Sequence, residues 1–267
     1  MAMESALPGV DPTVPSAARV YDLTLGGKNY FKVDKEFAEK ASQGMPELSD
    51  LAKSNRACLI RAVTHFAQDL GIRRYLDLGS GLPTQENVHE VARRVHPDAR
   101  TVYVDVDPTT RIHALSILDG DPYTAFIQAD ATKPETILEH PDTLALLSAG
   151  EPITVLLFAI VHFMPDSAQP RAAIQRFLDA VPAGSVLAIS SATIDGIHPE
   201  LERRLSEMYR DVPSPLVLRP EEEIMDLFCG LPIVGGELVD VGAWGVPQEE
   251  AAEAPWLRAV FGYAIKK

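Results

Sequence analysis

Tyr75-Leu-Asp-Leu-Gly-Ser-Gly-Leu-Pro-Thr84 is a short apolar strand that runs into a turn with two glycines and on toward a helix. This order is typical of a parallel α/β sheet that presents a ligand at the carboxyl ends of its strands. The next strand-like stretches, residues 101–106 and 124–129, also end beside aspartates. Three successive strand ends therefore offer glycine or carboxylate groups to one ligand.

Strand and helix patterns alternate through the rest of the chain. The apolar periodicity predicts strands at 74–78, 101–106, 124–129, 153–161, 185–190, 237–241 and 259–265. Helices are expected between them, at 84–95, 109–118, 166–181, 198–211 and 220–229. Such alternation favours a Rossmann-like α/β fold with a mostly parallel seven-stranded sheet flanked by helices. The last two strands are expected to be joined by the acidic, proline-bearing loop between them.

The region before the sheet differs from it in composition. Residues 1–15 are interrupted by proline and glycine and are expected to be a disordered tail. Residues 16–71 show helical periods and are expected to form an N-terminal helical cap. Residues 72–267 would then be the ligand-binding core, within one structural domain that includes the cap.

Composition limits the classes of function. The formal net charge is −14, and no basic run carries interleaved aromatic residues, which argues against nucleic acid as a partner. Cys58 and Cys229 lie far apart, so neither a disulfide framework nor a zinc site is indicated, and no histidine cluster suggests another metal. No apolar run approaches the roughly 20 residues of a membrane span. A soluble, cytoplasmic protein is expected, without a membrane partner.

The order of glycine turn and acidic strand ends resembles the class I S-adenosylmethionine (SAM)-dependent methyltransferases. Their glycine turn carries an acid two residues before its first glycine, as Asp77 stands before Gly79. A closer resemblance covers nearly the whole chain. The segment Pro15-Ser-Ala-Ala-Arg-Val-Tyr-Asp-Leu-Thr-Leu-Gly-Gly-Lys-Asn-Tyr-Phe31, with Ser54-Asn-Arg56 and His162-Phe-Met-Pro-Asp166, is similar to bacterial SAM-dependent methyltransferases long catalogued as a domain of unknown function. The resemblance implies SAM as cofactor and S-adenosylhomocysteine (SAH) as product.

SAM carries an amino acid, a ribose diol and an adenine but no phosphate, so its site needs carboxylates where a pyrophosphate site needs backbone amides. Asp77 would reach the ammonium group, and Asp105, or Asp107 as second choice, would accept from the ribose hydroxyls. One of these two aspartates is expected instead to cap the following helix. Asp130 would accept from the adenine amine. The full set of expected cofactor-binding residues is Asp77, Gly79, Ser80, Gly81, Asp105, Val106, Asp107, Asp130, Ala131, Phe158, Ala159, Ile160, Tyr21, Asn29 and Tyr30.

Polar and aromatic groups crowd around Gly26-Gly27 in the N-terminal block. One hypothesis is a lid over the cofactor that uses Tyr21, Asn29 and Tyr30 to exclude water and position the acceptor. The alternative, given equal weight, is a helix packed on the sheet edge with a solvated polar face.

His162, just past the predicted central strand, is the one candidate for a general base; a structural histidine bonded to nearby backbone is the favoured alternative. Tyr30, Tyr209 and Arg219 are weaker candidates for the acceptor side.

The sequence thus predicts a SAM-dependent methyltransferase that transfers the methyl group to a small molecule by in-line displacement. Oxygen, nitrogen, carbon and sulfur remain open as the acceptor atom, and the helices at about 198–230 are expected to form the acceptor site. The alternatives are a SAM-binding sensor or partner protein without transfer activity and a nicotinamide oxidoreductase. The acidic adenine side and Pro83 in the turn disfavour the oxidoreductase.

Overall fold

The computed structural model describes residues 9–44, 48–83, 86–209, 215–247 and 257–267 of the chain. One sheet has the strand order β3-β2-β1-β4-β5-β7-β6. Its strands are β1 (Arg74–Leu78), β2 (Arg100–Asp105), β3 (Thr124–Gln128), β4 (Thr154–Phe158), β5 (Val186–Ala192), β6 (Val239–Asp240) and β7 (Ala259–Ile265). The pairs among β1 to β5 are parallel, whereas β7 runs antiparallel to both β5 and β6. The expected α/β fold with a mostly parallel seven-stranded sheet is confirmed.

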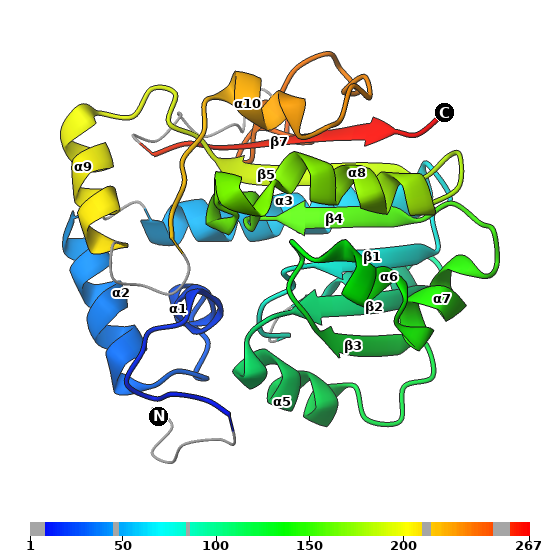
Figure 1. Ribbon diagram of the computed structural model, residues 1–267, viewed down its shortest axis with the longest axis horizontal. Coiled ribbons are helices and arrows are strands. Elements are labelled where there is room, and N and C mark those ends of the chain that lie inside the picture. Colours follow the sequence, from blue (N-terminus) through cyan, green and yellow to red (C-terminus); the bar gives the residue numbers. More distant parts are fainter. Residues whose placement is uncertain (1–8, 45–47, 84–85, 210–214, 248–256) are drawn as a thin grey trace.

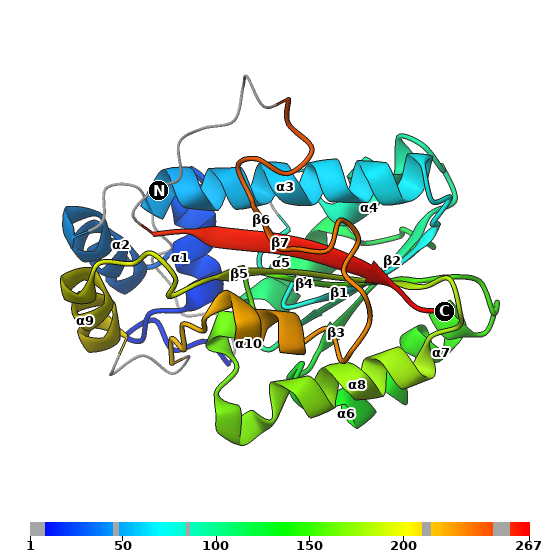
Figure 2. The same ribbon diagram turned by 90° about the horizontal axis from the view of Figure 1, so that it is seen from above.

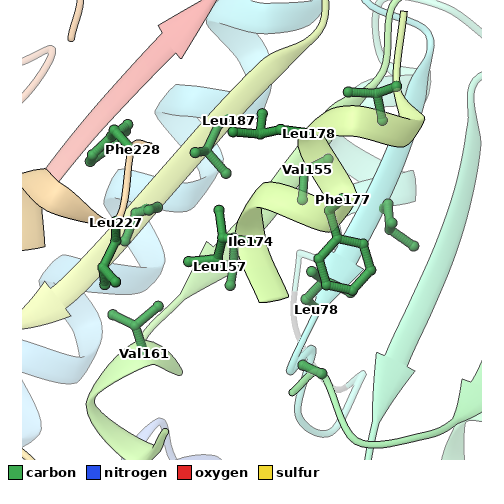
Figure 3. Packing of buried hydrophobic residues seen from close by; sticks show 14 of the residues in the cluster. Leu78, Val155, Leu157, Val161, Ile174, Phe177, Leu178, Leu187, Leu227 and Phe228 are labelled. Carbon is green, nitrogen blue, oxygen red and sulfur yellow. The ribbon is translucent and has the colours of Figure 1, made fainter. Parts of the chain in front are cut away.

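Helices cover both faces of the sheet (Figure 2). On one face lie α3 (Leu48–Gln68) and α4 (Val88–Arg93), and α5 (Pro108–Ile117) packs into the same core. On the other lie α6 (Pro134–Leu138), α7 (Pro141–Leu147), α8 (Pro170–Ala180) and α10 (Glu221–Asp226). Figure 3 shows Phe177 and Leu178 of α8 packed over Val155 and Leu187 of the strands. Because β4 is buried along its whole length, the central strands are fixed from both sides.

Three helices lie beyond the carboxyl ends of the parallel strands: α1 (Ala17–Thr24), α2 (Lys32–Gly44) and α9 (Pro199–Met208) (Figure 1). By contrast, α3, which the expected cap includes, packs lengthwise on the sheet (Figure 2). Residues 1–8 of the expected tail lie outside the described residues. Val10, in the part that is described, is only 7% exposed. The division into tail, cap and core stays a prediction.

Several elements are shorter than their apolar patterns predict. The strand expected at 153–161 ends at Phe158 because Ala159 adopts a left-handed backbone with φ of 53°. The helix expected from residue 84 begins at Val88, where the Glu90 carboxylate accepts from the Asn87 amide at 2.7 Å. Residues 84, 85, 210 and 211 of the expected helices lie outside the described residues. None of the described helices combines the length and apolar character needed to cross a bilayer.

Candidate functional site

The glycine turn after β1 is fastened to the end of β2. The amides of Gly79 and Ser80 donate to the Val104 carbonyl at 2.8 and 3.0 Å, and the Gly81 amide donates to Asp105 Oδ2 at 2.8 Å. Gly79 has a φ of +71°, and a Cβ there would lie 2.0 Å from Ile160 Cδ1. Only glycine fits this position, because both the backbone conformation and the close contact exclude a side chain.

A cavity of about 520 Å³ opens at this edge of the sheet. Its size lies within the roughly 300–1,000 Å³ of small-molecule sites. Most of the residues expected from the sequence line it: Tyr21, Asp77, Gly79, Ser80, Gly81, Asp105, Val106, Asp107, Asp130, Ala131, Phe158, Ala159, Ile160 and His162. Asn29 and Tyr30 do not belong to this lining.

Two buried carboxylates, those of Asp77 and Asp105, line the cavity beside the turn. Burial raises the pKa of Asp77 to about 7, against the opposing effect of the Arg56 guanidinium, and the Asp105 carboxylate raises it further. Burial also raises the pKa of Asp105 to about 6, although backbone amides that donate to it act in the other direction. Both carboxylates therefore lack part of the solvation that an ion needs, and a cationic or hydrogen-bond-donating ligand would supply it.

The two aspartates at the end of β2, Asp105 in the strand and Asp107 after it, have different local roles. Asp107 is the N-cap of α5, since its Oδ1 accepts from the Thr109 amide at 2.6 Å. Asp105 Oδ1 accepts from the Asp107 amide at 2.9 Å, and Oδ2 accepts from Gly81. A carboxylate has about four lone-pair sites, so each oxygen of Asp105 can accept one further hydrogen. Asp107 accepts from the Ser16 hydroxyl as well and lies 3.8 Å from Arg19 Nη1, so its charge already has a partner in the protein, which favours Asp105 for a diol.

Asp130 lies at the end of β3, and its Oδ1 accepts from both the amide and the hydroxyl of Thr132, at 2.9 and 2.7 Å. Burial raises its pKa, but the Thr132 hydrogen bonds and Lys133 outweigh burial and lower it. The Asp130 side chain is 37% exposed, and its Oδ2 lies 3.5 Å from Lys133 Nζ. A charged acceptor thus remains at the third strand end.

Arg56 is a site residue that the cofactor motifs did not reveal. It lies on α3 and lines the cavity, and its Nε is buried without a hydrogen-bond partner among the described residues. Its charge acts on Asp77, so a guanidinium and a carboxylate flank the same end of the cavity. An orphaned guanidinium nitrogen beside a desolvated carboxylate is complementary to a ligand with both an anionic and a cationic group. The amino acid part of SAM has these two groups.

The N-terminal block is held in place by a buried ion pair. Arg19 Nε lies 2.7 Å from Asp34 Oδ2, with the side chains 3% and 0% exposed. Arg19 also donates to Thr109 Oγ1 on α5 at 3.2 Å, and the Ser16 hydroxyl donates to Asp107. These contacts join α1 to α2 and to the helix after β2. These polar side chains of the segment therefore bind other parts of the protein.

The turn in the same block requires a glycine at position 27. A Cβ at Gly27 would lie 2.1 Å from Asp22 Oδ2, so a side chain there cannot coexist with the observed position of Asp22. The Asn29 amide donates to that same oxygen at 3.2 Å. The turn is thus closed around Asp22, and Asn29 takes part in the turn and not in the cavity lining.

A chain of hydrogen bonds connects α1, α3 and the sheet beside the cavity. The Tyr21 hydroxyl donates to the Ala52 carbonyl at 3.2 Å and accepts from Asn55 Nδ2 at 3.1 Å. The Ser190 hydroxyl donates to Asn55 Oδ1 at 2.7 Å and accepts from the Ala159 amide at 3.0 Å. This network holds Ala159 in its left-handed conformation next to the glycine turn, where such strain often marks a functional site.

His162 is buried, and its Nδ1 accepts from the Ala192 amide at 3.2 Å. Burial lowers the pKa of His162 to about 4, and the nearby Arg219 charge adds to this effect. The ring is therefore neutral at physiological pH and carries its proton on Nε2. In this tautomer Nε2 can donate a hydrogen bond but cannot accept a proton, which favours the structural role over the general base.

Two further acceptor-side candidates, Arg219 and Tyr209, differ in their position relative to the cavity. Arg219 donates to the carbonyls of Val161 and Met164 at 2.9 and 2.8 Å and does not line the cavity. It fixes the loop that carries His162. Tyr209 does line the cavity, and burial raises its pKa to about 12. Among the described residues, no group of three or more His, Cys, Asp or Glu side chains could hold a metal ion.

The sequence matches the family described as S-adenosyl methyltransferase over residues 3–266. A DUF574 family protein from Streptomyces avermitilis has a similar structure, with a TM-score of 0.90 and 34% identity over 96% of this chain and 99% of that one. A proposed methyltransferase from Thermobifida fusca YX gives a TM-score of 0.90 and 36% identity over 97% of this chain and 98% of that one. No curated protein matches the chain.

Proposed function

The chain belongs to the S-adenosyl methyltransferase family, and from this premise we propose that it transfers the methyl group of SAM to a small molecule by in-line displacement. SAM is accordingly its cofactor and SAH its product. The observation that carries the proposal is the cavity at the strand ends, where a glycine turn meets carboxylates at the ends of three strands. The net charge of −14 supports a small-molecule acceptor over a nucleic acid.

We assign the parts of the cofactor to described residues in order along the sheet edge. Asp130 and the Ala131 amide are assigned to the adenine, and Asp105 to the ribose diol. Phe158, Ala159 and Ile160 are assigned to the region between adenosine and sulfonium. Gly79 lets Ile160 pack directly against the turn, since Ile160 Cδ1 occupies the space that a side chain would need there.

Arg56 and Asp77 are assigned to the carboxylate and the ammonium of the amino acid. The orphaned Arg56 Nε and the raised pKa of Asp77, to about 7, support this assignment because each group lacks a full set of partners without a ligand. Charge-assisted hydrogen bonds of this kind are each worth about 1.5–3 kcal/mol. A bound ligand would supply both groups with the polar partners that water would otherwise provide.

When bound, SAM supplies a methyl group on a sulfonium, which a lone pair of the acceptor takes as the carbon–sulfur bond breaks and its electrons neutralise the sulfur. The protein's own contribution is to orient the two partners and to exclude water. His162 fits this role as a neutral hydrogen-bond donor through Nε2, because its Nδ1 is occupied by the Ala192 amide. Tyr21 joins α1 to α3 beside the cavity and is the remaining support for a lid.

Calorimetric titration with SAM, SAH and NAD tests the proposal. We expect SAM and SAH to bind and NAD not to bind. Asp105→Ala and Asp130→Ala should each weaken SAH by about 10- to 100-fold, since each removes a charge-assisted acceptor. Asp119→Ala, at an exposed position outside the cavity lining, is the matched control and should bind SAH like the wild type.

Binding of NAD alone, or SAH binding that survives both Asp105→Ala and Asp130→Ala, would overturn the cofactor assignment. Thermal melts of each variant without ligand separate a lost contact from a lost fold. A variant that melts like the wild type and fails to bind SAH has lost the site itself.

A further inference from the structure

The cavity extends from the strand ends into a separate hydrophobic cluster. This cluster, which we call the leucine end, contains buried Leu205 and Leu257 with half-buried Leu51, Leu216 and Leu218 packed against them. All five line the same cavity as Asp77 and Asp105. The leucines come from α3, α9, the segment before α10 and the residues just before β7. One continuous space therefore has a carboxylate-rich end and an apolar end.

Aromatic rings stand where the two ends meet. The Phe163 and Tyr209 rings lie 6.0 Å apart between centroids, and the His162 and Phe163 rings 4.6 Å apart. All three residues line the cavity, and Phe163 and Tyr209 are half-buried. Rings at such distances leave edges and faces to which a further aromatic ring can stack or pack edge-on.

The two ends of the cavity also differ in their charged side chains. The charged side chains that line the described cavity gather at the strand ends, where Arg19 faces Asp107 at 3.8 Å and Arg56 acts on Asp77. The titratable residues that line the described cavity near the leucine end are His162 and Tyr209, and burial keeps both neutral at physiological pH by lowering the pKa of the first and raising that of the second. The Arg219 charge also acts on His162, but Arg219 does not line the cavity. An ion placed there would lose its hydration and would meet no charged side chain among the described residues that line this end.

We propose that the leucine end is the acceptor site and that it takes an uncharged small molecule with an aromatic ring. This rests on the methyl transfer proposed above and adds the chemical class of the acceptor. The continuity of the cavity supports it, because a ligand at the leucine end lies next to the residues assigned to the cofactor. His162 and the Tyr209 hydroxyl are the polar groups that would orient such a ligand.

The test uses 1-naphthol and 1-naphthoate, which share one ring system and differ in charge at neutral pH. Each is titrated calorimetrically into the full-length protein saturated with SAH. We expect 1-naphthol to bind with one site per chain and 1-naphthoate to bind about tenfold more weakly or not at all, because of the uncompensated charge. Leu216→Asn should weaken 1-naphthol by about tenfold and leave the SAH affinity within about twofold.

Leu144→Asn is the matched control, since Leu144 is 52% exposed on α7 and does not line the cavity. It should change neither affinity. Equal binding of the two naphthyl compounds, full 1-naphthol binding by Leu216→Asn, or competition between 1-naphthol and SAH would each overturn the acceptor proposal. Failure of SAH itself to bind would instead refute the cofactor assignment, so the two failures are distinguishable.

Discussion

The strand-end half of the cavity is built from carboxylates, two arginines and a glycine turn, whereas the leucine end is built from aliphatic side chains and aromatic rings. The first half is destabilising without a ligand, because buried Asp77 and Asp105 are ionised with incomplete solvation at pH 8. The second half gains stability from the same burial. The comparison teaches that the strand-end half would gain stability from a bound ligand, whereas the leucine end is stabilised by its own packing.

The largest expected effect concerns the ion pair that anchors α1 beside the cavity. Asp34→Ala leaves the Arg19 guanidinium buried without its partner and should lower the free energy of unfolding by about 3–5 kcal/mol. Urea denaturation followed by circular dichroism measures this. Glu36→Ala, which breaks an exposed pair on the same helix, is the control and should cost under about 1 kcal/mol. Similar losses in both variants would mean that burial does not distinguish the two pairs.

Asp77→Asn should separate stability from binding. The folded-state pKa of Asp77 is raised from 3.8 to about 7, so its protonated form favours folding at low pH and this contribution is lost as pH rises through about 7. At pH 8, Asp77→Asn should therefore raise the free energy of unfolding without ligand by roughly 1–3 kcal/mol. It should also weaken SAH by about 10- to 100-fold, because the ammonium loses its partner.

The gain in stability should shrink at pH 5.5, where the wild-type carboxyl is largely protonated. Denaturation at both pH values, with and without SAH, provides the measurement. A destabilised Asp77→Asn protein at pH 8, or unchanged SAH affinity, would contradict the description of the strand-end half.

Arg56→Met tests the proposed contact between Arg56 and the carboxylate of the amino acid part of the ligand. It should weaken SAH by about 10- to 100-fold, because the carboxylate loses a charged donor. Binding of 5′-methylthioadenosine, which has no amino acid part, should be unchanged. Arg56→Lys should give an intermediate result, since a lysine keeps the charge but not the planar fork. Equal weakening of both ligands by Arg56→Met would indicate that Arg56 acts on the adenosine or on the fold.

Tyr209→Phe should have the smallest effect. Its ring packs edge-on against Phe37 at 5.3 Å between centroids, and the substitution keeps the ring. We expect SAH affinity within about twofold and a stability change within about 0.5 kcal/mol, as for substitutions that leave packing intact. Naphthol binding at the leucine end should weaken by a few-fold at most. A large loss of SAH affinity would place Tyr209 in the cofactor half.

The strand-end residues could be predicted because each follows a short apolar run, and the carboxyl ends of parallel strands meet at one edge. Which of Asp105 and Asp107 caps α5 depended on a single residue at the strand end, and the structure assigns the cap to Asp107. Ser54-Asn-Arg56 was one of the stretches that carry the family resemblance, but Arg56 received no role there because it lies within an ordinary amphipathic helix. An arginine one residue after buried Asn55, on the apolar side of α3, was the available signal.

The leucine end could not be predicted in detail from the sequence. Its side chains come from four separate segments, and leucines such as Leu51 and Leu216 have the same local pattern as core leucines. Only the tertiary arrangement of α9 beyond the strand ends brings them to the cavity (Figure 1). Asn29 and Tyr30 are close in sequence to Tyr21 but do not line the cavity. The turn at Gly27, which closes around Asp22, separates them from Tyr21, and this too is a tertiary feature.

The most direct test of the central claim is turnover with methyl-labelled SAM and a panel of uncharged aromatic alcohols and amines, each paired with its carboxylate counterpart. Mass spectrometry follows the labelled methyl group and the SAH released. We predict SAH formation matched mole for mole by a methylated uncharged compound, and no transfer by Asp105→Ala. Transfer to the carboxylates alone, or SAM that binds without SAH release across the panel, would contradict the claim.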